Sequence, residues 1–369
     1  MADKIDRRQF IKRSLALTAT SALLGMAGCK PRPTPFQTRA PAPAPISTLP
    51  GTAEISPTTT AAPSTAGPLP VTPQVASLAA AAPTGVQTTA PLAAETVQPA
   101  YLAVARGAGG DPRELTRQAI EAIGGIARFV KPGADVVIKP NICVAYHGPE
   151  FAATTNPDVV AEIVALCLGA GARRVRVMDS PFGGTPQQSY DRSGIAAAVS
   201  AAGGSMEVMS RVKYREVAIP QGKILKKWQV YGDILDADVL INVPIAKVHS
   251  AATLTLGMKN LMGVVSDRNG MHSRGLDQAI ADINTVVRPH LTVIDAIRIL
   301  VANGPTGGNL ADVQRIDTVI ASADVVAADA YASTLFGMKP EDIKYVRLGS
   351  AMGLGQIDLG ALRVREISV

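Results

Sequence analysis

The chain has few aromatic residues and few cysteines. Phe, Trp and Tyr make up 4% of its 369 residues, and the sequence contains three cysteines. No CxxC pair or CxxCxxC run occurs, so the sequence lacks the ligand pattern of an iron–sulfur cluster. Cys143 and Cys167 are far from each other in the sequence, and a disulfide between them is an open alternative, since an exported chain permits one without requiring it.

Common motifs of phosphate binding and acyl transfer are also missing. No GxGxxG follows the first predicted strand, and no GxxxxGK or GxSxG occurs, which argues against a dinucleotide fold, a P-loop and an α/β-hydrolase. The formal net charge is +6, but no basic run with interleaved aromatics is present, so nucleic acid is not expected as a partner. The modest positive charge favours a small anionic ligand or lipid head groups instead.

No apolar run is long enough to span a membrane, which takes about 20 residues. A shorter run at 15–26 follows the twin-arginine stretch DRRQFIK at 6–12. A basic start, a short apolar run and small residues before a cleavage site predict a secretory signal at 1–29. The arginine pair predicts export by the twin-arginine translocon. The ending Met-Ala-Gly-Cys resembles a lipoprotein signal, so we expect lipidation of Cys29 and anchoring to a lipid bilayer.

The segment 30–98 consists mostly of Pro, Ala and Thr. Such a composition cannot bury enough apolar surface to offset its ordering entropy, so we expect a disordered linker. Together with the lipidated cysteine, it predicts an extracytoplasmic protein that is tethered to a membrane on the cell surface or periplasmic side. The remaining segment, 99–369, is long enough for one substantial hydrophobic core, and we expect a single domain there.

Short apolar strands alternate with helices along 99–369. Asp111 and Pro112 predict a helix start, with Glu114 completing a capping box, and Asn156 predicts another. Strands are expected at 101–106, 134–139, 173–178, 206–209, 238–243, 291–295, 317–321 and 362–367, and further helices at 189–202, 251–265, 276–287, 324–336 and from 340. This alternation predicts an α/β fold, a mostly parallel, doubly wound sheet with helices on both faces. The irregular stretch 211–231 is expected to be an insertion or a flap, and a hairpin is one form that it could take.

Polar residues gather just after several of these strands. In an open parallel sheet, ligands bind outside the carboxyl ends of the strands. We therefore expect the following residues to bind a small anionic ligand: Lys139, Asn141, Asp179, Lys247, Asn260 and Asp295. For each residue alone the alternative stays open that it is an ordinary polar loop residue or caps the next helix.

The stretch 244–275 has the highest density of candidate chemical groups. Lys259 lies in an apolar stretch, which is an expensive position for a lysine unless it faces a pocket or a partner. His249 and His272 are close to it in the sequence, and a histidine beside a lysine can act as general acid and base. We expect these three residues to be catalytic. A snorkelling surface lysine and a solvated loop histidine are the alternatives.

No cofactor follows from the sequence. HExxH and HxH pairs are absent, so a metal site would have to be assembled by the fold. His147, His249 and His272 could converge with Asp179 or Asp295 on a divalent metal, and this alternative stays open.

A series of motifs resembles the family of domains of unknown function numbered 362. The motifs are VVIKPN (136–141), TTNPDVV (154–160), VMDSP (177–181), LINVPIAKVHSAATLTLGMKNLMG (240–263), His272, AIADIN (279–284), VIDAI (293–297), NGP (303–305) and ASADVVAADA (321–330). They follow one another over nearly all of 99–369. The resemblance implies no particular reaction, but its motif residues coincide with the strand-end candidates above. Many relatives carry a ferredoxin-like module, which implies a separate electron-transfer partner here, since this chain lacks the cysteine runs of such a module.

Two functions therefore compete. The first is an exported, membrane-anchored enzyme of redox or proton-transfer type that acts on a small anionic ligand. The second is a tethered lipoprotein that binds a ligand or a partner without chemistry.

Overall fold

The computed structural model describes residues 101–369. The predicted signal at 1–29, which includes Cys29, and the whole predicted linker at 30–98 lie outside the described residues. Among the residues described, no helix combines the length and the apolar character that crossing a membrane requires.

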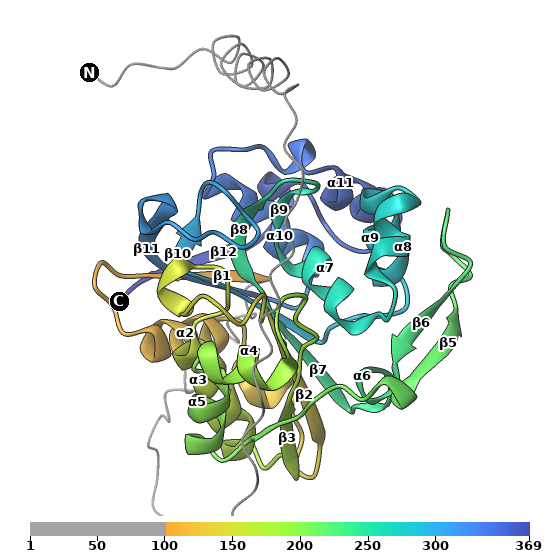
Figure 1. Ribbon diagram of the computed structural model, residues 1–369. Coiled ribbons are helices and arrows are strands. Elements are labelled where there is room, and N and C mark those ends of the chain that lie inside the picture. Colours follow the sequence, from red (N-terminus) through yellow and green to blue (C-terminus); the bar gives the residue numbers. More distant parts are fainter. Residues whose placement is uncertain (1–100) are drawn as a thin grey trace, which may run out of the picture. The chain divides into compact units, whose positions relative to one another are not determined.

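The core of the fold is a mixed sheet of ten strands (Figure 1). Eight of them form a continuous path in the order β12 (Val364–Ser368), β1 (Leu102–Arg106), β11 (Val313–Ser322), β10 (Leu291–Leu300), β7 (Val239–Val243), β2 (Asp135–Pro140), β3 (Arg174–Val177) and β4 (Ser205–Met206). Off this path, β8 (Ile245–His249) pairs with β10 and with β9 (Thr253–Thr255). Most neighbours are parallel, but β11 runs antiparallel to both β1 and β10, and β9 runs antiparallel to β8. The expected α/β class is thus confirmed, with an antiparallel portion that the sequence did not indicate.

Helices cover both faces of this sheet. On one face lie α2 (Pro112–Ala122), α3 (Pro157–Gly169) and α5 (Ile195–Ala201), and on the other α9 (Leu276–Asn284), α10 (Val325–Thr334) and α11 (Lys344–Ala351) (Figure 1). The alternation of side chains along each strand divides the core in two. In β1, for example, Leu102 and Val104 belong to one apolar cluster, whereas Ala103 and Ala105 belong to the other.

The predicted helix starts at Asp111 and Asn156 are confirmed. The carboxylate of Asp111 accepts a hydrogen bond from the backbone N–H of Arg113 at 3.0 Å, and the side chain of Asn156 caps α3 in the same way. The capping box expected with Glu114 does not form. Its carboxylate accepts instead from Arg117 and Gln118 on the same helix, a favourable contact at spacings of three and four residues.

Several predicted boundaries were wrong. The helix expected at 189–202 is two helices, α4 (Pro186–Arg192) and α5, because Gly194 between them adopts a left-handed conformation with φ of 73° that glycine tolerates. The strands expected at 291–295 and 317–321 are longer, since β10 and β11 pair over most of their length. The helix expected from 340 consists of the 3-10 turn η6 (Pro340–Asp342) followed by α11.

The helix expected at 251–265 was the largest error. The chain forms β9, the short helix α7 (Gly257–Asn260) and the 3-10 turn η4 (Leu261–Val264) there. Buried side chains form hydrogen bonds with backbone N–H and C=O groups that would bond to each other in a continuous helix. Asp329 accepts from the N–H groups of Gly257 and Met258 at 2.6 and 2.9 Å, and Asn242 and Asn284 donate to the carbonyls of the same two residues.

The stretch 211–231 contains the hairpin that was considered for it. Strands β5 (Tyr214–Ala218) and β6 (Lys227–Tyr231) pair antiparallel as a separate two-stranded sheet that extends away from the central sheet (Figure 1). The remaining elements are α6 (Gly232–Asp236), α8 (Arg268–Ser273), η1 (Ile126–Arg128), η2 (Pro149–Phe151), η3 (Arg211–Lys213), η5 (Leu310–Asp312) and η7 (Leu359–Ala361).

Candidate functional site

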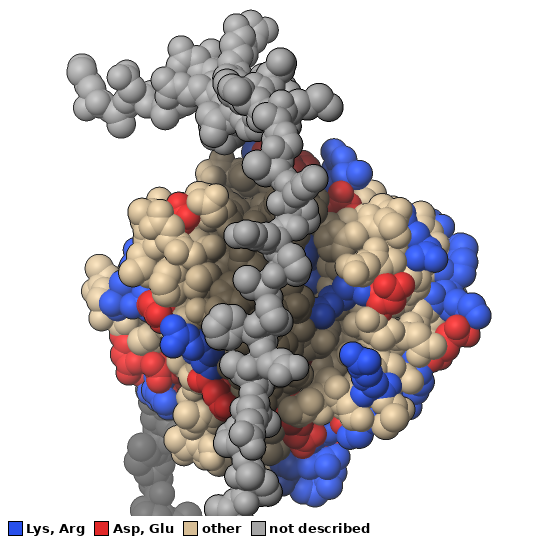
Figure 2. Space-filling view, viewed as in Figure 1, with Lys and Arg blue, Asp and Glu red and all other residues tan. Residues whose placement is uncertain are grey.

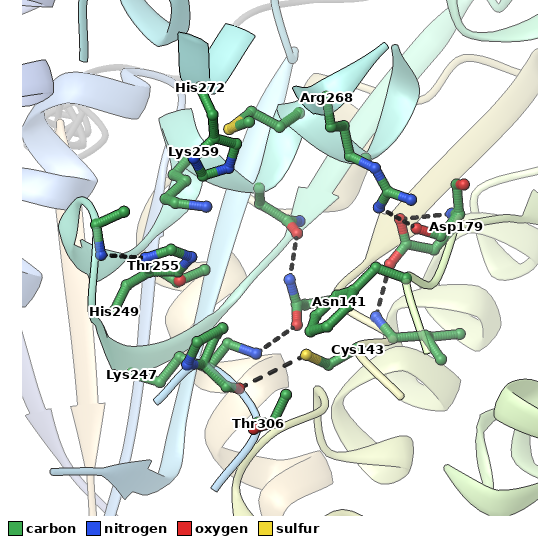
Figure 3. Close-up of a pocket in the computed structure, with 18 of the residues that line it drawn as sticks. Asn141, Cys143, Asp179, Lys247, His249, Thr255, Lys259, Arg268, His272 and Thr306 are labelled. Carbon is green, nitrogen blue, oxygen red and sulfur yellow. Dashed lines mark hydrogen bonds between the residues drawn. The ribbon is translucent and has the colours of Figure 1, made fainter. Parts of the chain in front are cut away.

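A cavity of about 690 Å³ lies at the carboxyl ends of β2 and β3 (Figure 3). The β8–β9 hairpin, α7, η4, α8 and the loop at 305–306 complete its wall. Of the residues expected to bind a ligand or to catalyse, those that line it are Lys139, Asn141, Asp179, Lys247, His249, Lys259, Asn260 and His272. Tertiary structure therefore brings together side chains from four separate segments of the sequence.

Asp295 is the exception, and its expected ligand-binding role is withdrawn. It lies within β10 and is not part of the cavity wall. Its carboxylate accepts from the backbone N–H groups of Asn156 and Ile297 at 2.7 and 3.0 Å, so it fixes the start of α3 against the sheet. Burial raises the pKa of Asp295 to about 6.

Lys139 and Asp179 form a buried ion pair at the base of the cavity. The Nζ atom of Lys139 lies 2.7 Å from Oδ1 of Asp179. Burial lowers the pKa of Lys139, and the neighbouring carboxylate partly offsets that effect. Asp179 also accepts from the backbone N–H groups of Ile142 and Ser180 at 2.6 and 2.8 Å. Both oxygens of the Asp179 carboxylate therefore have partners within the protein.

Two amide side chains link Lys139 to the second buried lysine. Oδ1 of Asn260 accepts from Lys139 Nζ and from Asn141 Nδ2, each at 3.0 Å. Oδ1 of Asn141 in turn accepts from Lys247 Nζ at 3.0 Å. Lys247 also donates to the carbonyl of Ala153 at 2.6 Å. These contacts hold both lysines and both amides in one orientation, although burial lowers the pKa of Lys247 as well.

Lys259 differs from the other two lysines. Its side chain is only 9% exposed, yet among residues 101–369 it has no ion pair or hydrogen bond that would hold its amine (Figure 3). Burial, reinforced by the positive charge of Lys247, lowers its pKa to about 7. The alternative of a snorkelling surface lysine is excluded, because the side chain is buried and lines the cavity.

His249 and His272 lie beside Lys259 on the cavity wall (Figure 3). Their ring centroids are 6.5 Å apart at an interplanar angle of 27°. Nδ1 of His249 accepts from the backbone N–H of Ala251 at 3.0 Å, so the proton of its neutral form is on Nε2. Burial and then the nearby lysines lower the pKa of His249 to about 3, and the same causes lower that of His272, which is more exposed. Both rings are neutral at pH 7.

Three further residues of the cavity were not among the expected site residues. Arg268 belongs to the stretch 244–275, and its guanidinium donates to the carbonyls of Ser180 and Pro181 at 2.7 and 3.2 Å. Thr255 carried no sequence signal. Its hydroxyl is buried in the cavity wall without a hydrogen-bond partner among the described residues. Cys143 also lines the cavity.

The disulfide alternative is not realised, since Cys143 and Cys167 are both free and buried. The divalent-metal alternative also lacks support in the described part of the chain. No group of three or more His, Cys, Asp or Glu side chains gathers there in a way that could hold a metal ion. His147 packs against the rings of Tyr146 and Phe151 instead of joining the cavity histidines.

The outer surface has a different character from the cavity. On the face shown in Figure 2, much of the described surface is uncharged, and Lys and Arg side chains lie next to Asp and Glu mainly toward the rim. In the cavity, by contrast, Lys247, Lys259 and Arg268 have no carboxylate within ion-pair distance among residues 101–369. The positive charge is thus concentrated where a ligand would bind.

These features define a mixed α/β domain with a cationic cavity at the carboxyl ends of its strands. The chain belongs to the family described as "Domain of unknown function (DUF362)", whose model matches residues 136–334. That range contains every cavity residue discussed above. The membership expected from the motifs is confirmed.

One curated relative is the thylakoid-associated protein sll1697 of Synechocystis, 27% identical over 246 residues, which cover 64% of this chain and 74% of that protein. Two solved structures are similar at lower levels. The lactate racemase apoprotein from Thermoanaerobacterium thermosaccharolyticum matches with a TM-score of 0.40 and 11% identity over 66% of this chain and 57% of that one. A protein from Thermotoga maritima matches with a TM-score of 0.38 and 10% identity over 61% and 58%. The chain thus spans less than two thirds of either solved chain, and neither similarity assigns an activity.

Proposed function

We propose that the protein is a proton-transfer enzyme that acts on a small anionic ligand in this cavity. The observation that carries the proposal is the position of Lys259, a buried amine without a partner in the described chain, beside two neutral histidines. A group with a pKa near 7 exchanges protons most efficiently at neutral pH. Such a group is costly to bury, and costly groups of this kind cluster at functional sites.

The charges of the cavity support an anionic ligand. Asp179 balances Lys139, but no carboxylate of the described chain lies within ion-pair distance of Lys247, Lys259 or Arg268. A small anion that enters the cavity would supply the missing negative charge. Because a nearby anion favours the charged form of an amine, ligand binding would also raise the pKa of Lys259.

The proposed roles follow from the hydrogen bonds that each side chain already forms and from the groups that it still has available. Lys139 and Lys247 are held by fixed acceptors, so they contribute positive charge and position. Lys259 gives or takes the proton, and the Nε2–H of His249 and the ring of His272 donate or accept hydrogen bonds on the same wall. Asn141 and Asn260 keep the two fixed lysines in place.

Binding of acetate and of inorganic phosphate, measured by titration calorimetry on the purified protein, tests the anion site. Affinity should fall as the pH rises from 6 to 9, because Lys259 loses its charge in that range. Lys259→Met should weaken binding strongly. Lys131→Met, a change of an exposed lysine outside the cavity, should not. Equal affinity of all three proteins at all pH values would disprove the anion site.

Hydrogen exchange tests the chemistry. Pyruvate incubated with the protein in deuterated water should lose its methyl proton signal faster than pyruvate alone or with Lys259→Met. Binding without any accelerated exchange of pyruvate or related acids would favour the second candidate, a non-catalytic binding protein. The fixed hydrogen bonds of Lys139 and Lys247 favour that candidate, since they would form a rigid receptor for an anion.

We also propose that the domain works on the extracytoplasmic side of a membrane, anchored through Cys29. The support is the signal pattern at 1–29 and the linker composition at 30–98. Cys29→Ser should release the exported protein from the membrane fraction, and an unchanged distribution would contradict lipid anchoring. A redox version of the enzyme, with a separate electron-transfer partner, is supported by the ferredoxin-bearing relatives alone. A visible absorption spectrum of the protein purified after export tests it.

A further inference from the structure

We propose that Lys259 is a nucleophile whose amine forms an imine with the carbonyl carbon of a small 2-oxo acid. This inference deepens the proposed function and rests on it, because the same cationic cavity would hold the carboxylate of that acid. It assigns a substrate class, a carbonyl compound with a neighbouring carboxylate, and a covalent role to one named residue.

The cavity contains three lysines, and hydrogen bonding singles out one of them. The Nζ atom of Lys139 lies within 3.0 Å of three oxygen acceptors, on Pro140, Asn260 and Asp179, which match its three N–H donors. Lys247 donates to Asn141 and to Ala153. An amine held in this way must break several hydrogen bonds before its lone pair can attack a carbonyl. Lys259 has no such bonds to break within the described chain.

The backbone beneath Lys259 is firmly held, although no group of residues 101–369 holds its amine. Asp329 accepts from the first two N–H groups of α7, and Asn242 and Asn284 bind the carbonyls of Gly257 and Met258. The position of the side chain's base is therefore fixed by four hydrogen bonds from other elements. A fixed stem with a free amine is the arrangement that attack on a bound ligand requires.

The protonation state of Lys259 suits this role. Its pKa of about 7 leaves roughly half of the amines neutral at pH 7, whereas roughly one in 3,000 amines with the ordinary value of 10.5 is neutral there. Only the neutral amine has a lone pair with which to attack. Desolvation and neighbouring positive charge are the recognised means of activating an amine for imine formation.

The neighbouring groups suit the two ends of a 2-oxo acid. Lys247 and Arg268 supply positive charge without a carboxylate partner in the described chain, which favours the ligand's carboxylate. His249 presents an Nε2–H that can donate a hydrogen bond to an oxygen of the ligand.

The proposed reaction balances without an oxidant or a reductant. The lone pair of the neutral amine forms a C–N bond to the carbonyl carbon, and the π electrons of the C=O bond move to oxygen. That oxygen takes a proton, and the nitrogen loses one to give a carbinolamine. A hydronium ion from the solvent protonates its hydroxyl, which leaves as water while the nitrogen lone pair forms the C=N bond, and the iminium nitrogen then returns one proton to the solvent. The Nε2–H of His249 donates a hydrogen bond to the oxygen during this step. One amine and one ketone thus give one imine and one water.

Reductive trapping tests the inference. The full chain, purified after export, is incubated with pyruvate and cyanoborohydride at pH 7, and intact mass and peptide mapping locate the adduct. We expect about one trapped pyruvate per chain, on Lys259, formed at least a hundredfold faster than on exposed lysines, given the difference in neutral amine. Acetate, which has the carboxylate but no ketone, should compete and slow the trapping.

Two variants control the experiment. Lys259→Arg keeps a positive charge and should form no adduct at this position, while Lys227→Arg, a change of an exposed lysine on β6, should trap pyruvate as the natural chain does. Circular dichroism checks that both variants fold. Trapping of natural protein at Lys139, at Lys247 or only at exposed lysines would overturn the inference.

Failure of this inference can be told apart from failure of the proposed function. If acetate binds with the expected pH dependence but pyruvate is not trapped on Lys259, the imine is wrong and the anion site stands. If neither acetate binding nor trapping depends on Lys259, both proposals are wrong.

Discussion

The Nζ atom of Lys139 lies 2.7 Å from Oδ1 of Asp179, and their side chains are 1% and 4% exposed. The pair joins the end of β2 to the segment after β3 at the base of the cavity. Two buried charges at this distance stabilise each other, but each is costly when left alone. The pair therefore stabilises the site. Removing one of the two charges should affect stability differently from removing both.

We expect Lys139→Met and Asp179→Leu each to lower the free energy of unfolding by about 3–5 kcal/mol, the usual cost of leaving one buried charge unpaired. The double variant should lose less than the sum, because no unpaired charge remains. Urea unfolding at pH 7 measures all three. Strictly additive losses would show that the two charges are not coupled. Asp179→Leu should be the worse single change, since it also leaves the N–H groups of Ile142 and Ser180 without an acceptor.

Gly263 lies against this pair. A Cβ atom at Gly263 would come within 2.4 Å of Asp179 Oδ1 and 2.6 Å of Lys139 Nζ. We expect Gly263→Ala to lower the free energy of unfolding by about 1–3 kcal/mol, the usual cost of overpacking. Gly169→Ala is the matched control, because a Cβ at Gly169, the last residue of α3, meets nothing within 4 Å. A Gly263→Ala variant as stable as the control would contradict the packing described here.

The pKa of Lys259 makes stability depend on pH. The folded pKa of about 7 lies below the unfolded value of 10.5, so the unfolded chain binds more protons between these values. Stability should therefore rise with pH across that window, and the cost of burying the charge is full below pH 7. We expect Lys259→Met to be more stable than the natural chain by roughly 2–5 kcal/mol at pH 6, with the advantage shrinking toward pH 10. Thermal unfolding across this range would refute the expectation if the difference stayed constant.

Asp329 positions the helix that carries Lys259. Asp329→Ala removes the acceptor of two backbone N–H groups of α7, and each unsatisfied buried donor costs about 1–3 kcal/mol. We expect lower stability together with weaker acetate binding, since α7 also carries Asn260 of the cavity wall. Asp295→Ala is the control. It removes another buried acceptor of two N–H groups outside the cavity, so it should destabilise the fold while acetate affinity is kept. If Asp329→Ala bound acetate as tightly as the natural chain, Asp329 would not be needed to position the site.

The two free cysteines should differ in reactivity. Cys143 lines the cavity, whereas Cys167 is fully buried within α3, where burial raises its pKa to about 12. Iodoacetamide should label Cys143 first in the folded protein, and acetate should slow that labelling. Peptide mapping identifies the site, with Cys143→Ser as the control. Equal labelling of Cys167, or no protection by acetate, would contradict the proposed position of the ligand.

The sequence predicted those features that depend on neighbouring residues. Apolar runs marked most strands, and the caps at Asp111 and Asn156 marked helix starts correctly, because capping is decided within a few residues of the helix end. The position of Lys139, Asn141 and Asp179 after successive strands predicted the cavity, because parallel strands end at one edge of the sheet.

Features that depend on distant residues were decided by the tertiary structure. The segment 251–265 reads as a helix in isolation, but Asp329, 72 positions from Gly257, takes the N–H groups where α7 begins. Asp295 has the same strand-end signal as Asp179, yet only one of them faces the cavity. Asn260 meets Lys139 across 121 positions, and this contact occupies one lysine, while Lys259 has no such partner within residues 101–369. Local sequence patterns indicate burial and chain direction. The hydrogen-bond partner of a buried polar group, by contrast, is fixed only when separate segments of the chain pack together.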